Sequence, residues 1–173
     1  MNAEEMLDKI HRAGYWRIVL HPAEFQPHRI GTLQECLAIV ERSIVSLRGW
    51  DYPFVDPNNI IFGDDWISLA EDSEFEVEFW RFYQSGQFVH HLALPRVERH
   101  GQPIIELGDL LYQLTEILEF AARLALRDIF DGSAAIHVQL NNIQGYILHV
   151  TSGLPASVRK YQSASGSLEW KHS

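Results

Sequence analysis

The stretch that decides the fold is Glu74–Leu94, EFEVEFWRFYQSGQFVHHLAL. At its start apolar residues alternate with glutamates, and a period of two is typical of a strand with one buried face. Ser85-Gly86 lies between this run and a second apolar run, and glycine accepts the positive φ that hairpin turns need. The stretch therefore predicts a β-hairpin with Ser85-Gly86 as a two-residue turn.

This turn sets a register and hence two faces. It pairs Tyr83 with Phe88, and Phe79 with Leu92. The predicted core face then carries Phe75, Val77, Phe79, Tyr83, Phe88, Leu92 and Leu94. The other face carries Glu76, Glu78, Trp80, Phe82, Val89, His91 and Ala93. Since neighbouring large aromatics rarely face open solvent, we expect a loop of the chain or a partner to cover this second face.

Composition places the chain among ordinary folded domains. It has 173 residues, 46% of them hydrophobic and 21% charged, which fits one domain with a real core. We expect this domain to cover residues 1–155, with 156–173 as a polar C-terminal tail or the start of a further element. The net charge of −9 argues against nucleic acid as a partner.

Cysteine usage and hydropathy suggest a compartment. Cys36 is the one cysteine, so no internal disulfide is expected and the residue is interpreted as structural. No apolar run approaches the length of a membrane helix, and the acidic N-terminus does not resemble a signal peptide. These features predict a cytoplasmic protein that does not enter the membrane.

The elements around the hairpin indicate an α+β fold. Helix signals include a cap at Asn2 and a capping box formed by Thr32 and Glu35, with Gly49 as the expected end of the second helix. Helices are expected at 3–13, 32–48 and 109–130, and strands at 15–21, 60–62, 66–70, 135–140 and 146–150, with 95–103 as a polar connection. This order predicts a single, mainly antiparallel sheet with two or three helices packed on one face.

Arginine and aromatic residues mark a candidate ligand site. Arg48 and Arg81 could hold an anionic or planar ligand, because arginine stacks on aromatic rings and pairs with carboxylate or phosphate. The alternative is that these arginines pair with nearby acidic residues and fix the loop. The candidate ligand-binding residues are Arg48, Trp50, Asp51, Tyr52, Trp80, Arg81, Phe82 and His91.

Acidic and histidine residues offer a weaker catalytic alternative. Glu76, Glu78 and His91 share a predicted face and could perform acid–base chemistry or hold a divalent cation, although a solvated strand face has the same pattern. His90 and His91 point to opposite faces and are not expected to share a metal. His137 and His149 could meet only if the register of their strands allowed it. No catalytic residue, metal ligand or cofactor is therefore assigned.

Three blocks resemble regions of uncharacterised prokaryotic proteins. They are residues 15–17 (YWR), 48–53 (RGWDYP) and 80–88 (WRFYQSGQF). Some of the similar proteins resemble chains that carry a Schlafen/AlbA-type putative DNA-binding domain elsewhere. The resemblance covers roughly residues 10–150, brings no catalytic residues, and implies an accessory, sensing or interaction module linked to regulation or defence.

These observations predict a non-enzymatic module for binding, sensing or protein interaction. Its partner could be another protein, a second copy of the chain as a homo-oligomer, or a small anionic molecule. The alternative is a metal-assisted hydrolase or nuclease-like enzyme that uses Glu76, Glu78 and His91. A third hypothesis is a nucleic-acid contact through a basic patch of Arg12, Arg17, Arg29, Arg42 and Arg48.

Overall fold

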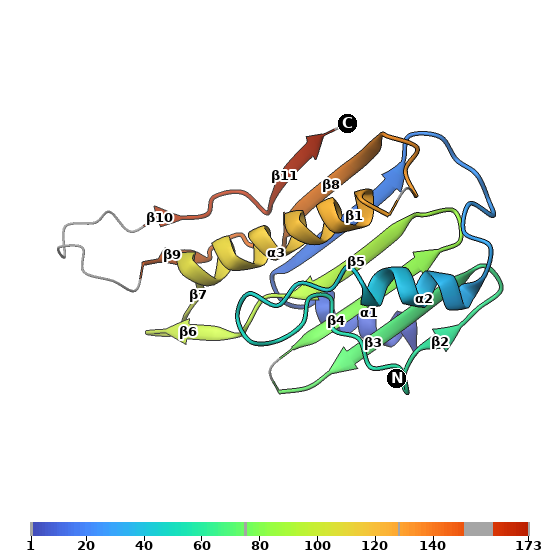
Figure 1. Ribbon diagram of the computed structural model, residues 1–173. Helices are drawn as coiled ribbons and strands as arrows, with labels where there is room; N and C mark the ends of the chain where they lie inside the picture. Colours follow the sequence, from blue (N-terminus) through green and yellow to red (C-terminus); the bar gives the residue numbers. More distant parts are fainter. Residues whose placement is uncertain (1, 75, 128, 151–160, 173) are drawn as a thin grey trace.

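A computed structural model describes residues 2–74, 76–127, 129–150 and 161–172. The body of the protein is a seven-stranded antiparallel sheet with strand order β11-β8-β1-β5-β4-β3-β2. Two helices, α2 (Leu33–Glu41) and α3 (Leu107–Ala125), lie on one face, and α1 (Ala3–His11) lies on the other (Figure 1). The predicted α+β fold, with a mainly antiparallel sheet and up to three helices, is confirmed. The placement of every helix on one face was wrong.

The strands of this sheet come from most of the chain. They are β1 (Tyr15–Pro22), β2 (Ile61–Phe62), β3 (Trp66–Asp72), β4 (Val77–Tyr83), β5 (Phe88–Ala93), β8 (Ala134–Asn141) and β11 (Ser167–His172). A second sheet has the order β10-β9-β7-β6. Its strands are β6 (Val97–Arg99), β7 (Gln102–Glu106), β9 (Ile147–His149) and β10 (Tyr161–Gln162).

The hairpin of β4 and β5 forms, but its predicted register was wrong. Phe82, not Tyr83, pairs with Phe88. The Tyr83 amide donates to Gln87 (2.9 Å), and Gly86 has a φ of +84°, so the loop has three residues and ends on a left-handed glycine. One extra loop residue shifts the register by one, and this shift exchanges the two faces of β4 relative to β5.

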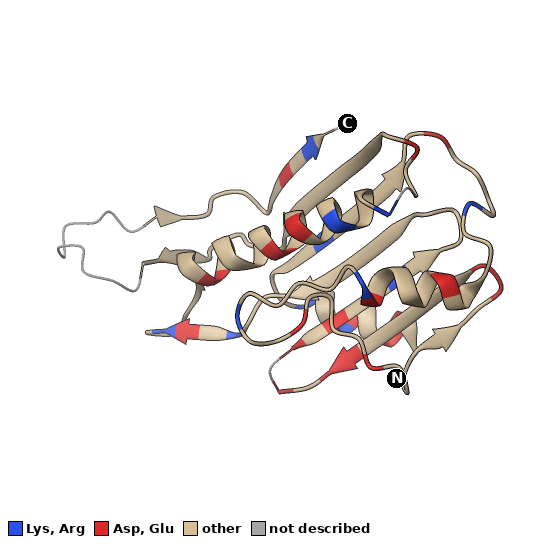
Figure 2. Cartoon of the chain, viewed as in Figure 1, with Lys and Arg blue, Asp and Glu red and all other residues tan. Residues whose placement is uncertain are grey.

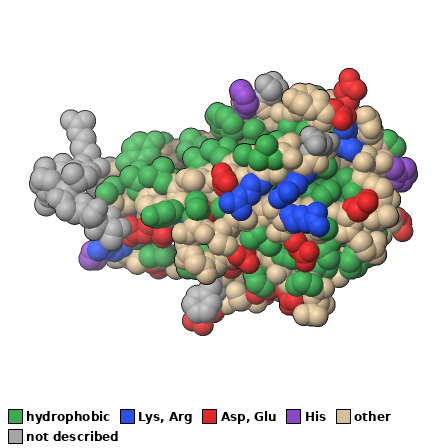
Figure 3. Space-filling view, in the orientation of Figure 1, with side chains coloured by type: hydrophobic (Ala, Val, Ile, Leu, Met, Phe, Trp, Pro, Cys, Tyr) green, Lys and Arg blue, Asp and Glu red, His purple; other side chains and the backbone are tan. Residues whose placement is uncertain are grey.

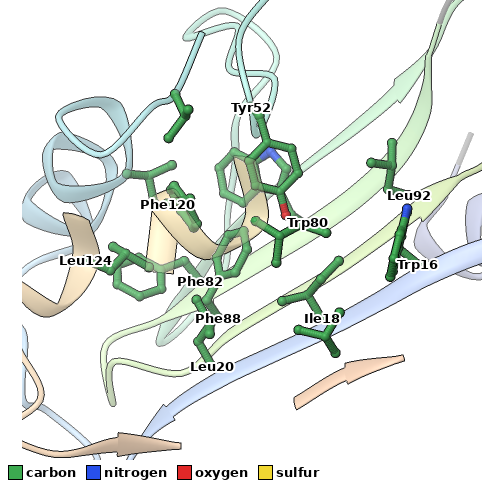
Figure 4. Close-up of a cluster of buried hydrophobic side chains, with 14 of the residues drawn as sticks. Trp16, Ile18, Leu20, Tyr52, Trp80, Phe82, Phe88, Leu92, Phe120 and Leu124 are labelled. Carbon is green, nitrogen blue, oxygen red and sulfur yellow. The ribbon is translucent and has the colours of Figure 1, made fainter. Parts of the chain in front are cut away.

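The β4 residues Trp80 and Phe82, which were expected to need a cover, therefore lie on the main core face, together with Phe88 and Leu92 of β5, which were predicted to be core. Trp80, Phe82 and Phe88 are fully buried beneath α2 (Leu33–Glu41) and α3 (Leu107–Ala125) (Figure 4). The Phe88 and Phe120 ring centroids lie 4.9 Å apart. Each buried aromatic contributes roughly 2–3 kcal/mol by leaving water, so this face provides much of the stability.

The opposite face holds a smaller core under α1 (Ala3–His11). Met6 and Ile10 of the helix pack on Phe79, with Val77 and Ala93 at the margin. The expected cap at Asn2 is confirmed, with a complete capping box to Glu5. Of the predicted core face, Val77 and Phe79 of β4 belong to this smaller layer, whereas Phe88, Leu92 and Leu94 lie in the main core. The expected member Phe75 lies outside the described residues.

The ends of α2 and α3 differ from the predictions, and α3 spans Leu107–Ala125 where 109–130 was expected. The capping box of Thr32 and Glu35 is confirmed, but α2 ends at Glu41. Residues 42–60, which we call the covering loop, then cross the sheet and are held by paired backbone bonds between Val45 and Tyr52 (2.9 and 2.8 Å). Gly49, the expected end of the helix, lies within this loop with a φ of +92°. The helix therefore ends almost two turns earlier than expected.

The region after β5 also contains structure that the sequence analysis missed. The connection predicted at 95–103 contains β6 and the start of β7. β9 pairs with β7 and β10 rather than with β8, so the expected hairpin of two late strands was wrong. The C-terminal segment contributes β10 and the edge strand β11, which pairs along its length with β8.

Candidate functional site

The covering loop places two aromatic residues over the core face of the hairpin. Tyr52 is buried beneath the covering loop, and its ring lies edge-on to Phe120, with centroids 5.9 Å apart. The backbone of Phe54 makes two bonds to β4: its amide donates to Glu78 (2.8 Å), and its carbonyl accepts from the Trp80 indole N–H (2.8 Å). The loop therefore seals this part of the face.

A fully buried pair lies under the seal. The distance between Glu78 Oε2 and His90 Nε2 is 2.7 Å, and that between His90 Nδ1 and the Tyr52 hydroxyl is 3.1 Å. Burial raises the pKa of Glu78 to about 8 and lowers the pKa of His90 to about 3. At pH 7 the proton therefore lies on Glu78, which donates to a neutral imidazole, whose Nδ1–H then donates to Tyr52.

A second pair closes the loop against α3. The Nε of Arg48 donates to both oxygens of Glu116 (3.2 Å each), and Nη2 donates to Oε2 (2.6 Å). Glu116 is fully buried, and 12% of the Arg48 side chain is exposed. The guanidinium also stacks on Trp50, 4.8 Å from the ring centroid. The positive charge of Arg48 is therefore already neutralised by the protein.

A pocket of about 430 Å³ opens next to this sealed region. Such a volume lies in the range of small-molecule sites. Trp50, Phe54 and Leu92 provide apolar walls, and roughly half of the Trp50 side chain is exposed. The remaining lining residues are Arg48, Glu71, Ser73, Glu76, Ala93, Pro95, Asp109 and Gln113.

The polar lining of the pocket is acidic. Burial raises the pKa of Glu76 to about 8, so this group is largely protonated at pH 7. Within the part of the chain that the structure describes, Glu71 and Asp109 form no ion pair. With Arg48 neutralised by Glu116, the pocket has a net negative charge and favours a cation over an anion.

The predicted ligand residues do not form one site. Arg48 and Trp50 line the pocket, whereas Asp51 accepts a hydrogen bond from the Ser46 hydroxyl on the surface of the loop. Tyr52 is buried in the seal, and Trp80 and Phe82 belong to the core. The aromatic part of the expected site is thus structural.

Two more predicted residues lie on the other side of the sheet. The Arg81 guanidinium stacks 4.0 Å above the Trp66 ring and also faces Phe79. His91 Nδ1 is 3.1 Å from His11 Nε2 beneath α1. The expected joint use of Arg48 and Arg81 for an anionic ligand therefore does not match their positions.

The acidic and histidine constellation of the enzyme hypothesis is also divided. Glu78 contacts His90 in the sealed core, whereas His91 points to the α1 face. His137 lies in the large sheet and His149 in the small one, where His149 bonds Glu106 (2.8 Å). Within the described ranges, no three His, Cys, Asp or Glu side chains are grouped to hold a metal.

The arginines of the proposed basic patch are similarly dispersed. Arg17 bonds Gln139 on the α1 face (3.0 Å), while Arg29 pairs with Asp131 at the far end of the sheet. Figure 2 shows Lys and Arg interspersed with Asp and Glu over the visible elements. The described structure thus has no single basic surface that combines these residues.

Several site residues were missed by the sequence analysis. Glu116, which is fully buried next to Ile117 in α3, was not among the predicted site residues. Gln113, which accepts from the Trp16 indole (2.8 Å), and Asp109 also line the pocket from this helix. Their spacing of three to four residues places them on one side of a helix, a signal that becomes useful only when the position of the covering loop is known.

Comparison with known proteins adds no relative, since no family model, curated protein or solved structure matches the chain. No helix among the described residues combines the length and apolarity that crossing a membrane requires. Cys36 is buried, and burial raises the pKa of its thiol to about 12, in agreement with a structural role.

Proposed function

We propose that the chain is a non-enzymatic binding or sensing module whose ligand site is the pocket between the covering loop and the start of α3. The observation that carries this proposal is the combination of a half-exposed Trp50 with Glu71 and Asp109, in a pocket whose single arginine is neutralised by the protein. A module of this kind fits the accessory role in regulation or defence that the sequence resemblance implies.

The ligand class follows from the lining. A flat apolar group can stack on Trp50 and contact Leu92. An ammonium group attached to it can approach Asp109 or Glu71, while a carboxylate would meet negative charge. We therefore propose a small aromatic or other planar amine as the ligand, in place of the anionic ligand that the sequence suggested.

The test compares phenethylamine with 3-phenylpropanoate by isothermal titration calorimetry and by quenching of tryptophan fluorescence. We expect the amine to bind at least about tenfold more tightly, since one favourable charge contact contributes roughly 1.4 kcal/mol or more. Asp109→Asn and Trp50→Ala are each expected to weaken amine binding. Asp64→Asn removes an exposed carboxylate outside the pocket and serves as the matched control.

Two outcomes would contradict the proposal. The first is the absence of saturable binding by either compound at millimolar concentration. The second is equal binding of the amine by the wild-type protein and the Trp50→Ala variant, because this would place the ligand elsewhere. Circular dichroism of each variant shows whether the fold is retained.

A further inference from the structure

We propose that two copies of the chain associate through β11, edge to edge and antiparallel, with Trp170 on the twofold axis. β11 lies at one edge of the seven-stranded sheet, where β8 alone among the described parts of the chain pairs with it. Half of its backbone donors and acceptors point outward, and an open edge of this kind pairs readily with another strand.

The two edges of the large sheet differ in length. β2 at the opposite edge has two residues, whereas β11 has six, and all six side chains are exposed. β11 contains no proline, and its register with β8 runs without a bulge from Ser167 to His172. It therefore lacks two of the devices by which proteins protect an edge.

The core-side surface next to β11 is apolar. Leu168 and Trp170 lie opposite Leu140 and Val138, on the side of the sheet that α3 covers, yet they are 56% and 47% exposed. The flank of α3 that faces away from the covering loop adds exposed leucines. Figure 3 shows hydrophobic side chains gathered along this margin, where Figure 1 places α3 and β11. The exposed leucines of this flank are Leu111 and Leu118.

The charges on β11 identify a second copy as the partner. Glu169 and Lys171 flank Trp170 and pair with each other on the other side of the sheet (3.0 Å). In an antiparallel pair centred on Trp170, Glu169 of one subunit lies opposite Lys171 of the partner subunit, and the reverse pair forms as well. Opposite charges at facing positions stabilise a strand pair, and like charges destabilise it, so this strand is complementary to itself.

The twofold axis would also bury the apolar margin. The two sheets join into one, both α3 helices lie on the same side of it, and the two Trp170 side chains meet between them. An isologous contact of this type closes after two copies and does not continue into a fibre. The interface lies at a different edge from the ligand pocket, so it does not depend on the proposed function.

Charge exchange provides the test, with size-exclusion chromatography and light scattering on the full chain over a range of concentrations. We expect a mass of twice 19.9 kDa for the wild-type protein. Lys171→Glu and Glu169→Lys each create two like-charge pairs and should weaken dimerisation roughly tenfold or more. The double variant restores both attractive pairs and should recover the wild-type dissociation constant within about threefold.

A mixture of the two single variants gives the sharpest result. One strand then carries two lysines and the other two glutamates, so every facing charged pair is attractive, and the mixture should dimerise more tightly than either variant alone. A wild-type protein that stays monomeric at high concentration would overturn the proposal. A dimer that both single variants leave unchanged would also overturn it, because a different surface would then be in use.

Discussion

Adjacent residues of the central hairpin lie in different environments on its two faces. His90 and His91 are adjacent, and burial lowers the pKa of both to about 3. His90 lies in a sealed core with Glu78 and Tyr52, while His91 meets His11 under a short helix at the margin. The partners of a strand residue therefore depend on the layer in which it lies rather than on its residue type.

The largest expected effect comes from truncating the core face. Trp80→Ala removes a fully buried ring and leaves the Phe54 carbonyl without its donor, so we expect a loss of about 3–5 kcal/mol in the free energy of unfolding. Arg81→Ala is the matched change on the other face. It removes stacking on Trp66 and should cost about 1 kcal/mol or less.

Urea denaturation measures both variants. If Trp80→Ala does not fold, Trp80→Phe keeps a ring and should show an intermediate loss. Equal losses for the Trp80 and Arg81 variants would mean that the two faces are equivalent, which would contradict the assignment of Trp80 to the main core.

Replacing Arg48 of the covering loop or Arg17 of the α1 face is expected to have a smaller effect on the free energy of unfolding. Arg48→Met leaves the fully buried Glu116 without its partner and should cost about 3 kcal/mol. Arg17→Met on the other face loses one bond to the neutral Gln139 and should cost about 1 kcal/mol.

Thermal and urea unfolding of both arginine variants test this difference. The double variant Arg48→Met, Glu116→Leu removes the buried charge together with its partner, so it should recover most of the stability. If Arg48→Met behaves like Arg17→Met, the carboxylate of Glu116 must be hydrated rather than buried.

The sequence predicted the local elements better than their packing into layers. The fold class, the capping boxes and the hairpin followed from local patterns, because alternation and capping depend on neighbours in the chain. The register did not, since Gln84-Ser85-Gly86 and Ser85-Gly86 are both acceptable turns, and one residue of difference exchanges the faces. The wrong register then assigned Trp80 and Phe82 to a ligand site.

The pocket could be predicted only in part. Arg48 and Trp50 were recognised because arginine next to an aromatic residue is a local signal. The neutralisation of Arg48 by Glu116 depends on a contact across 68 positions of the chain. In addition, α2 had been expected to continue into the covering loop. The acidic character of the pocket thus depends on the tertiary structure. The sequence alone suggested an anionic ligand because it does not show that Arg48 is paired.

The pH dependence of stability is expected to come from buried titratable groups on both faces. The pKa of Glu78 is about 8 in the folded protein and 4.5 as its ordinary value. Between these values the unfolded chain releases a proton that the folded protein keeps, so this group lowers stability as pH rises through that window. His90 and His91 act in the opposite direction, because their lowered pKa values reduce stability as pH falls from 6.5 toward 3.

The most direct test of the sealed, neutral Glu78–His90 pair is the unfolding free energy of the wild-type protein and the Glu78→Gln variant from pH 5 to pH 8. Glutamine can accept from Phe54 and donate to His90 as the protonated glutamate does. We expect similar stabilities near pH 5 and a relative gain for the variant of up to about 1.4 kcal/mol per pH unit above it. Parallel pH profiles would show that Glu78 is ionised in the folded protein and would contradict the neutral pair.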